Sequence, residues 1–157
     1  MTTTHFSEFR NVELSTIKYI ESNINTDWTG ITTVKSFTLA YEANLPVIAV
    51  YGSDIYPDYK EIGSTTLLNK YQINIDIFAK SDGQRIDLTG YITELLKDPW
   101  IYYLASHSSG NTSMIYTDST KKIRVQDFIT NTKVDFGDDV DTYDKFRQKI
   151  VVNVLKL

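Results

Sequence analysis

The sequence predicts an α+β fold in which an antiparallel or mixed sheet carries two amphipathic helices packed on one face. Two observations support this. Apolar residues recur at helical spacing in two segments, residues 6–24 and 84–97. From Leu67 to Ala79, apolar and polar residues alternate as they do in a half-buried strand. Further apolar runs surround these segments, so the order along the chain is helix, several strands, helix, several strands.

The bulk composition indicates one globular domain spanning residues 1–157. Hydrophobic residues make up 41% and charged residues 23%, which is ordinary for a folded domain. The absence of cysteine excludes disulfides, a thiol nucleophile and a thiolate metal site. The chain has no apolar run of membrane-spanning length, and it opens without the basic-then-apolar pattern of a signal peptide. We therefore expect neither a membrane span nor a secretory signal.

The first predicted helix covers residues 6–24. Ser7 is its candidate N-cap, with Arg10 in place of an acid three residues later, and residues 25–27 end it. One face is charged, and the other carries the apolar residues Phe6, Phe9, Leu14, Ile17, Ile20 and Ile24.

The second predicted helix covers residues 84–97. Ser81 and Gln84 stand in capping-box relation before it, and Pro99 closes it. Gly90 weakens it by about 1 kcal/mol relative to alanine. Its apolar positions are Ile86, Leu88, Ile92, Leu95 and Leu96.

The remaining segments are predicted mostly as strands. On the strand at 67–79, the face opposite the apolar one carries Lys70, Gln72, Asn74 and Asp76. Other strands are predicted at 46–51, 59–63, 100–106 and 146–157, with a partner strand beginning at Met114. Residues 56–59 are predicted as a turn, and residues 28–44 fit a strand or a short helical turn. For residues 117–145 we expect strand fragments and a long polar loop.

Catalytic chemistry has no recognisable motif in this chain. Glycine-rich phosphate loops and the nucleophile elbow of serine hydrolases are missing. The two histidines, His5 and His107, are far apart, and we interpret them as terminal and turn residues. Asp82-Gly83 opens a helix, where a turn and cap are favoured over a phosphate site.

The acidic stretch of residues 135–144 fails the register of a calcium-binding EF-hand, so we interpret it as a solvated loop. Its carboxylates are Asp135, Asp138, Asp139, Asp141 and Asp144. The sequence therefore predicts no catalytic residue, no cofactor-binding residue and no metal ligand. A small carboxylate-based hydrolase remains as a minor alternative, but no pair of acids stands out for it.

Charge and aromatic content point to protein contacts rather than to nucleic-acid binding. The formal net charge is −4, and neither half of the chain is basic. The chain contains 11 Tyr, 7 Phe and 2 Trp, side chains that serve well in strands and interfaces. We interpret the aromatic run at 100–103 as core and interface, since no basic residues interleave with it.

One block resembles a known family. Glu61-Ile-Gly-Ser64 precedes Lys70-Tyr-Gln-Ile-Asn-Ile-Asp-Ile-Phe-Ala-Lys-Ser-Asp-Gly-Gln-Arg-Ile-Asp-Leu88. This block is similar to the neck and tail-terminator (tail-completion) proteins of tailed bacteriophages. In those proteins a strand of this pattern runs into a Ser/Asp-Gly-x-Arg-x-Asp-Leu segment that opens a helix. The preceding strand at Leu45-Pro-Val-Ile and the leading amphipathic helix come in the expected order.

The resemblance implies a virion structural protein at the head–tail junction, assembled in the host cytoplasm. Such proteins form a homo-oligomeric ring, usually six-fold, that caps the tail tube and joins it to head-completion or neck proteins. DNA passes through the lumen without being read, and the family has no catalytic residues. The alternative is an assembly adaptor or chaperone that never enters the particle. A ring needs two complementary patches. The candidate contact segments are 51–59, 108–122 and 135–144, with solvated loops as the alternative for all three.

Overall fold

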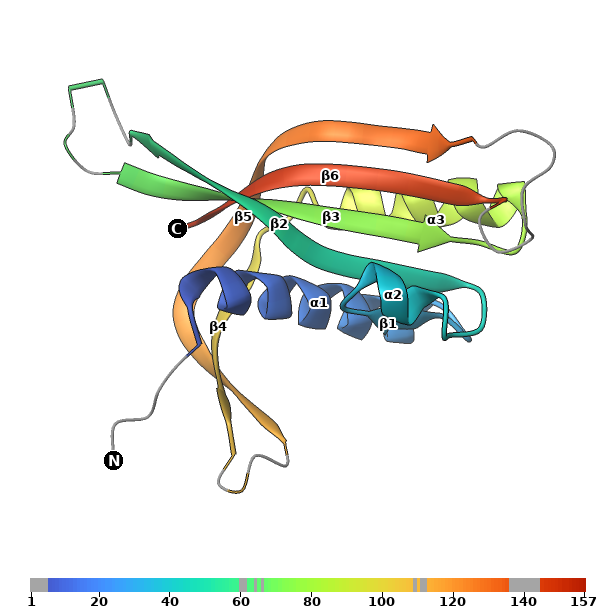
Figure 1. The fold of residues 1–157 in the computed structure, drawn as a ribbon, viewed down its shortest axis with the longest axis horizontal. Coiled ribbons are helices and arrows are strands. Elements are labelled where there is room, and N and C mark those ends of the chain that lie inside the picture. Colours follow the sequence, from blue (N-terminus) through green and yellow to red (C-terminus); the bar gives the residue numbers. More distant parts are fainter. Residues whose placement is uncertain are drawn as a thin grey trace.

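The computed structural model describes residues 6–59, 62, 63, 65, 67–108, 110, 113–135 and 145–157. Three helices and six strands alternate irregularly along these residues (Figure 1). In chain order they are α1 (Glu8–Asp27), β1 (Thr32–Val34), α2 (Phe37–Ala40), β2 (Val47–Tyr59), β3 (Leu67–Phe78), α3 (Asp82–Leu95), β4 (Trp100–His107), β5 (Met114–Val134) and β6 (Arg147–Lys156).

The strands form one six-stranded sheet in the order β1-β2-β3-β6-β5-β4. Only the short edge strand β1 is parallel to its neighbour, and the other pairs are antiparallel. The predicted α+β class with a mixed sheet is therefore confirmed. The ambiguous segment 28–44 holds both of the structures that its sequence fits, β1 and α2.

The sheet is curled, and α1 lies against strands from both ends of the strand order. It contacts β1 and β2 near one end and β4 at the other (Figure 1). Strand β5 makes the curl possible, because its first half pairs with β4 and its second half with β6. Figure 1 shows β5 turning from its hairpin with β4 into the sheet beside β6.

Strand β5 changes direction at a bulge opposite Tyr102. Tyr103 pairs with Asp118 and Ile101 with Lys122, so three residues of β5 stand against one of β4. Within the bulge, the hydroxyl of Ser119 donates to the carbonyl oxygen of Tyr102, and Thr120 has a positive φ of 66°. Extra residues in one strand increase its local twist and bend.

Over residues 117–134 the prediction of strand fragments and a long loop was wrong, because β5 continues unbroken to Val134. Residues 136–144 of the predicted loop lie outside the described residues. Ile123 is the only residue of β5 that is fully buried, so the strand has no alternating pattern to reveal it. Backbone pairing with two neighbours holds it instead.

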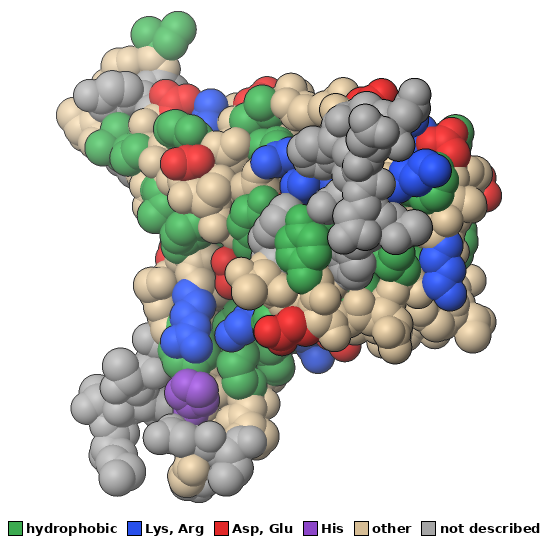
Figure 2. Space-filling model, turned by 45° about the vertical axis from the view of Figure 1, so that its right-hand side comes forward, with side chains coloured by type: hydrophobic (Ala, Val, Ile, Leu, Met, Phe, Trp, Pro, Cys, Tyr) green, Lys and Arg blue, Asp and Glu red, His purple; other side chains and the backbone are tan. Residues whose placement is uncertain are grey.

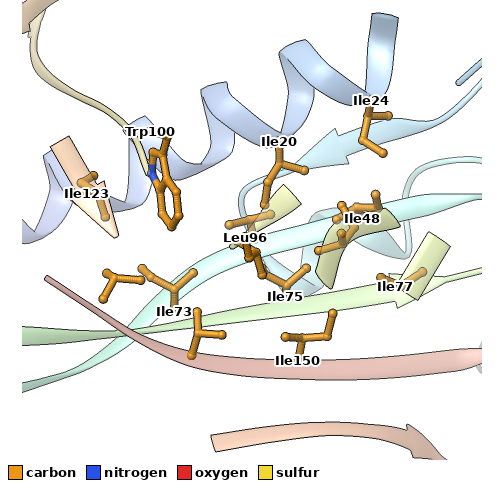
Figure 3. Close-up of a cluster of buried hydrophobic side chains, with 14 of the residues drawn as sticks. Ile20, Ile24, Ile48, Ile73, Ile75, Ile77, Leu96, Trp100, Ile123 and Ile150 are labelled. Atoms are coloured by element: carbon orange, nitrogen blue, oxygen red, sulfur yellow. The ribbon is translucent and has the colours of Figure 1, made fainter. Parts of the chain in front are cut away.

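The main core cluster contains buried side chains of the sheet, of α1 and of α3 (Figure 3). Side chains at alternating positions of β3 and β6 meet Ile20 and Ile24 of α1 and Leu88 and Ile92 of α3. The strand residues concerned are Tyr71, Ile73, Ile75, Ile77, Ile150, Val152 and Val154, all at most 1% exposed. Burial of this many branched side chains is the dominant favourable term in folding.

The opposite face of β3 is less open than the sequence predicts. Lys70 and Gln72 are half-buried, but Asn74 and Asp76 are buried. Phe78, which breaks the alternation, joins a second small cluster with Ala40 of α2 and with Val47 and Ala49 of β2. The short helix α2 thus contributes to a cluster on the face that the alternation assigns to solvent.

Several boundaries also differ from the predictions. The first helix runs from Glu8 to Asp27 rather than over 6–24, so residues 25–27 continue it instead of ending it. The second helix runs from Asp82 to Leu95 rather than over 84–97, and Ser81 caps it by accepting from the N–H of Gln84. The turn predicted at 56–59 is wrong, because these residues extend β2 and pair with Leu67 to Lys70. The strand predicted at 59–63 was wrong at residues 62 and 63, which form a turn. Tyr59 instead ends β2, and residues 60 and 61 lie outside the described residues.

Candidate assembly surfaces

Polar side chains of α1 bond to backbone groups of the strands on either side of it. The N–H of Gly52 in β2 donates to Glu13 Oε2 at 2.8 Å. In β4, the N–H of Tyr103 donates to Ser15 Oγ at 2.9 Å, and that of Ala105 to Asn11 Oδ1 at 3.1 Å. We call Asn11, Glu13 and Ser15 the α1 seam. Because β4 is an edge strand, the seam occupies N–H groups that would otherwise be free to pair with another chain.

The α1 seam was not predicted from the sequence. Asn11 and Ser15 stand four residues apart and flank the buried Val12 and Leu14, so they share the buried side of the helix. Polar residues at that spacing within an apolar stripe indicate buried hydrogen bonds, and this signal was available.

Beyond Gly52, strands β2 and β3 project from the body as an arm, which we define as residues 54–59 and 67–72 (Figure 1). Among the described residues, no strand pairs with the other edge of β2 along this arm. Ile55 and Leu67 are 44% and 54% exposed, and Tyr56 is exposed as well. Figure 2 shows hydrophobic side chains gathered on this projection at the upper left.

The arm continues the apolar face of the core beyond the end of α1. Ile55 pairs with Tyr71, which belongs to the core cluster and stacks on the ring of Phe9 at 5.4 Å. Pro57 lies in β2 here, and proline is found on edge strands because it lacks an N–H donor. The arm is therefore better suited to side-chain contacts than to strand addition.

A second projection is the far end of the β4–β5 hairpin, residues 104–107 and 114–117 (Figure 1). Ile115 is exposed there. His107 is also exposed, and its ring meets that of Phe6 edge-on at 5.0 Å. His107 is the last residue of β4, paired with Met114, rather than the turn residue that was predicted.

An ion pair is buried on the sheet face opposite the main core. Arg147 donates to Asp76 Oδ1 through Nη2 at 2.9 Å and through Nε at 3.3 Å, and Tyr51 donates to Oδ2 at 2.9 Å. Burial, followed by the charge of Asp76, raises the pKa of Tyr51 to about 12. These three side chains are bonded within one partly buried network, so we interpret the cluster as structural.

At the N-terminus of α3, the carboxylate of Asp82 already supplies a negative charge. Asp82 pairs with Arg85 at 3.0 Å and lies 3.7 Å from Lys133, and the hydrogen bond from Arg85 lowers the pKa of Asp82. A phosphate group would have to displace this carboxylate, so the turn-and-cap interpretation of Asp82-Gly83 stays favoured.

The other candidate residues fall partly outside the described structure. Residue His5 and four of the five acids in the 135–144 stretch lie outside it, and only Asp135 is described. Among the described residues, no group of three His, Asp or Glu side chains is arranged to hold a metal ion. Of the predicted contact segments, 51–59 lies in β2, and its residues 54–59 form the outer strand of the arm. Segment 108–122 is described at residues 108, 110 and 113–122, mostly in β5.

Comparison with known proteins identifies no family. No protein-family model matches the chain, and no curated protein matches it significantly. None of the helices in the described part of the chain is long and apolar enough to cross a membrane.

Proposed function

We propose that the protein is a non-enzymatic structural subunit of a tailed-bacteriophage virion, acting at the head–tail junction as a neck or tail-terminator ring protein. The observation that carries the proposal is the unit formed by β3 and α3. The residues that resemble the phage family occupy β3, the short connection at 79–81 and the first half of α3. Ser81 caps the helix, and Gln84 Oε1 accepts from the N–H of Lys80.

The arrangement of surfaces supports a role in assembly. In this proposal α1 and α3 share one face of the sheet as two amphipathic helices and stabilise it, so the projecting parts are free for contacts. The arm carries exposed apolar side chains, and the β4–β5 hairpin projects elsewhere. A closed ring needs two different patches that complement each other on neighbouring copies. The net charge of −4 suits a channel through which DNA passes without sticking.

The proposal is tested on the purified chain and on particles. We expect light scattering coupled to size exclusion to report an oligomer, and electron microscopy to show rings with a central opening. Mass spectrometry of purified virions should detect the protein in a few copies per particle. A protein that stays monomeric and is missing from particles would contradict the proposal. Rings without incorporation into virions would instead identify the assembly adaptor or chaperone.

A further inference from the structure

A small cavity lies between α1 and the start of β4, away from the arm. Its volume is about 220 Å³. It is lined by Lys18, Tyr19 and Ser22 of α1, by Pro99, Trp100, Ile101 and Tyr103 at β4, and by Lys122 of β5. The proposed function does not use this cavity, and no motif in the sequence marks it.

The cavity has a firm aromatic wall. The rings of Tyr19 and Trp100 stack at 5.2 Å with an interplanar angle of 7°. Trp100 is only 2% exposed, and the hydroxyl of Tyr19 donates to the carbonyl oxygen of Leu95 at 2.8 Å. Both rings are therefore held before anything binds, which reduces the entropy lost on association.

The charged members of the lining are both lysines. Neither Lys18 nor Lys122 forms an ion pair with another described residue. Lys18 Nζ lies 4.8 Å from the ring centre of Tyr116 and 5.5 Å from that of Tyr103, so aromatic faces hold its ammonium group in place. The cavity thus combines an apolar floor with two cations that have no carboxylate partner in the lining.

The size of the cavity and its surroundings decide what it can accept. Pockets for small molecules usually measure roughly 300–1,000 Å³, so this one fits a side chain better than a whole ligand. Asp98 and Glu21 lie close enough to Tyr19 and Tyr116 to raise the pKa values of these tyrosines, after burial as the main cause. These acids leave no continuous basic field for a polyanion such as DNA. A short acidic peptide does not need such a field, because two of its carboxylates can reach the two lysines directly.

We propose that this cavity is a docking site for an acidic segment of a partner protein. An apolar side chain of the segment sits against Tyr19 and Trp100, and neighbouring carboxylates pair with Lys18 and Lys122. This inference rests on the proposed function only in taking the occupant to be another protein of the assembly.

The test uses the full chain and a labelled peptide, acetyl-Asp-Asp-Phe-Asp-Asp-amide, with binding followed by fluorescence anisotropy. The control peptide carries Asn in place of every Asp. We expect binding of the acidic peptide alone, weakened by added salt because the charges are near the surface. Lys18→Gln and Lys122→Gln should each weaken binding about ten-fold, as expected for loss of a charge-assisted contact. Lys35→Gln removes an exposed cation between β1 and α2 and should change nothing.

A second variant tests the apolar part without altering charge. Ser22→Phe places a ring in the cavity from the exposed side of α1, so it should abolish binding while the circular dichroism spectrum stays that of the wild type. Equal binding of both peptides, no binding at millimolar peptide, or equal effects of Lys35→Gln and Lys122→Gln would overturn the inference. Tighter binding of a short single-stranded oligonucleotide at the same lysines would also overturn it. These outcomes do not depend on whether the protein is found in virions, so each proposal can fail alone.

Discussion

Glu13 of α1 accepts a hydrogen bond from the backbone N–H of Gly52 at 2.8 Å, and at this point the helix leaves no room for a side chain on β2. A Cβ built on Gly52 would lie 2.6 Å from the ring of Phe9. That ring is itself stacked on Tyr71. The pair Glu13–Gly52 therefore marks where α1 crosses β2 and where the arm begins.

Gly52→Ala should destabilise the fold. The added methyl group forces the Phe9 ring off Tyr71, and overpacking of this kind costs about 1–3 kcal/mol. Urea unfolding followed by circular dichroism measures the effect. In a Phe9→Leu background the smaller side chain makes room, so the same change should cost clearly less. An equal cost in both backgrounds would show that the ring contact is not the cause.

Gly90→Ala is the matched change in open space and should have the opposite sign. Apart from the neighbouring residues and the backbone of α3 itself, no atom lies within 4 Å of a Cβ at this position in the middle of α3. Alanine restricts the unfolded chain and favours the helix, so we expect a gain of about 0.5–1 kcal/mol in the free energy of unfolding. The same urea titration reports it, and a loss of stability would show an unrecognised contact at this face.

Asp76→Asn should lower the free energy of unfolding by about 3–5 kcal/mol, because it removes the carboxylate charge that faces the buried guanidinium of Arg147. Thermal or urea unfolding reports the change. The double variant Asp76→Leu/Arg147→Met removes both charges and should recover much of the loss. A double variant as unstable as Asp76→Asn would mean that packing, rather than the uncompensated charge, sets the cost.

The raised pKa of Tyr51 predicts that the folded protein loses stability at high pH. Its pKa is raised to about 12 in the folded protein, mainly by burial and then by Asp76, against 10.0 without these effects. Between pH 10 and 12 the unfolded chain loses this proton while the folded protein keeps it, so the free energy of unfolding falls as pH rises. Below pH 10 the contribution is fully present. Tyr51→Phe should show a shallower decline over this range, and an unchanged slope would contradict the assignment.

The sequence predicted the elements whose side chains face one core. The first helix, β3 and the closing strand show clear periodicity because one side of each meets the main cluster. Prediction from the sequence failed for β5, because this strand is mostly exposed and is held by backbone pairing. It also failed for Asn74 and Asp76, which are buried on the face of β3 that was assigned to solvent. The cavity between α1 and the start of β4 could not be predicted from the sequence for a related reason. Lys18, Trp100 and Lys122 are distant in sequence, and they meet because β5 pairs with β4 and α1 packs against β4.

Asn11 joins three groups in one buried place, and its replacement tests the α1 seam. Its Nδ2 donates to the carbonyl oxygen of Phe6 and to the Tyr102 hydroxyl, and its Oδ1 accepts from the N–H of Ala105. Asn11→Ala leaves these groups without that hydrogen-bond partner. We therefore expect the free energy of unfolding to fall by about 1–3 kcal/mol, the usual cost of an unsatisfied buried group. Thr26→Ala on the same helix removes an exposed hydrogen bond and should cost far less.

Hydrogen exchange separates the seam from a general loss of stability. In Asn11→Ala the amide of Ala105 should exchange faster than global unfolding alone explains, because its acceptor on α1 is gone. The amide of Tyr103, whose partner is Ser15, should follow the global value. The freed N–H of Ala105 lies on an edge strand and can pair with another chain. The variant should therefore form oligomers more readily as the protein concentration rises. If the Ala105 amide stays as protected as its neighbours in the variant, α1 does not seal this edge.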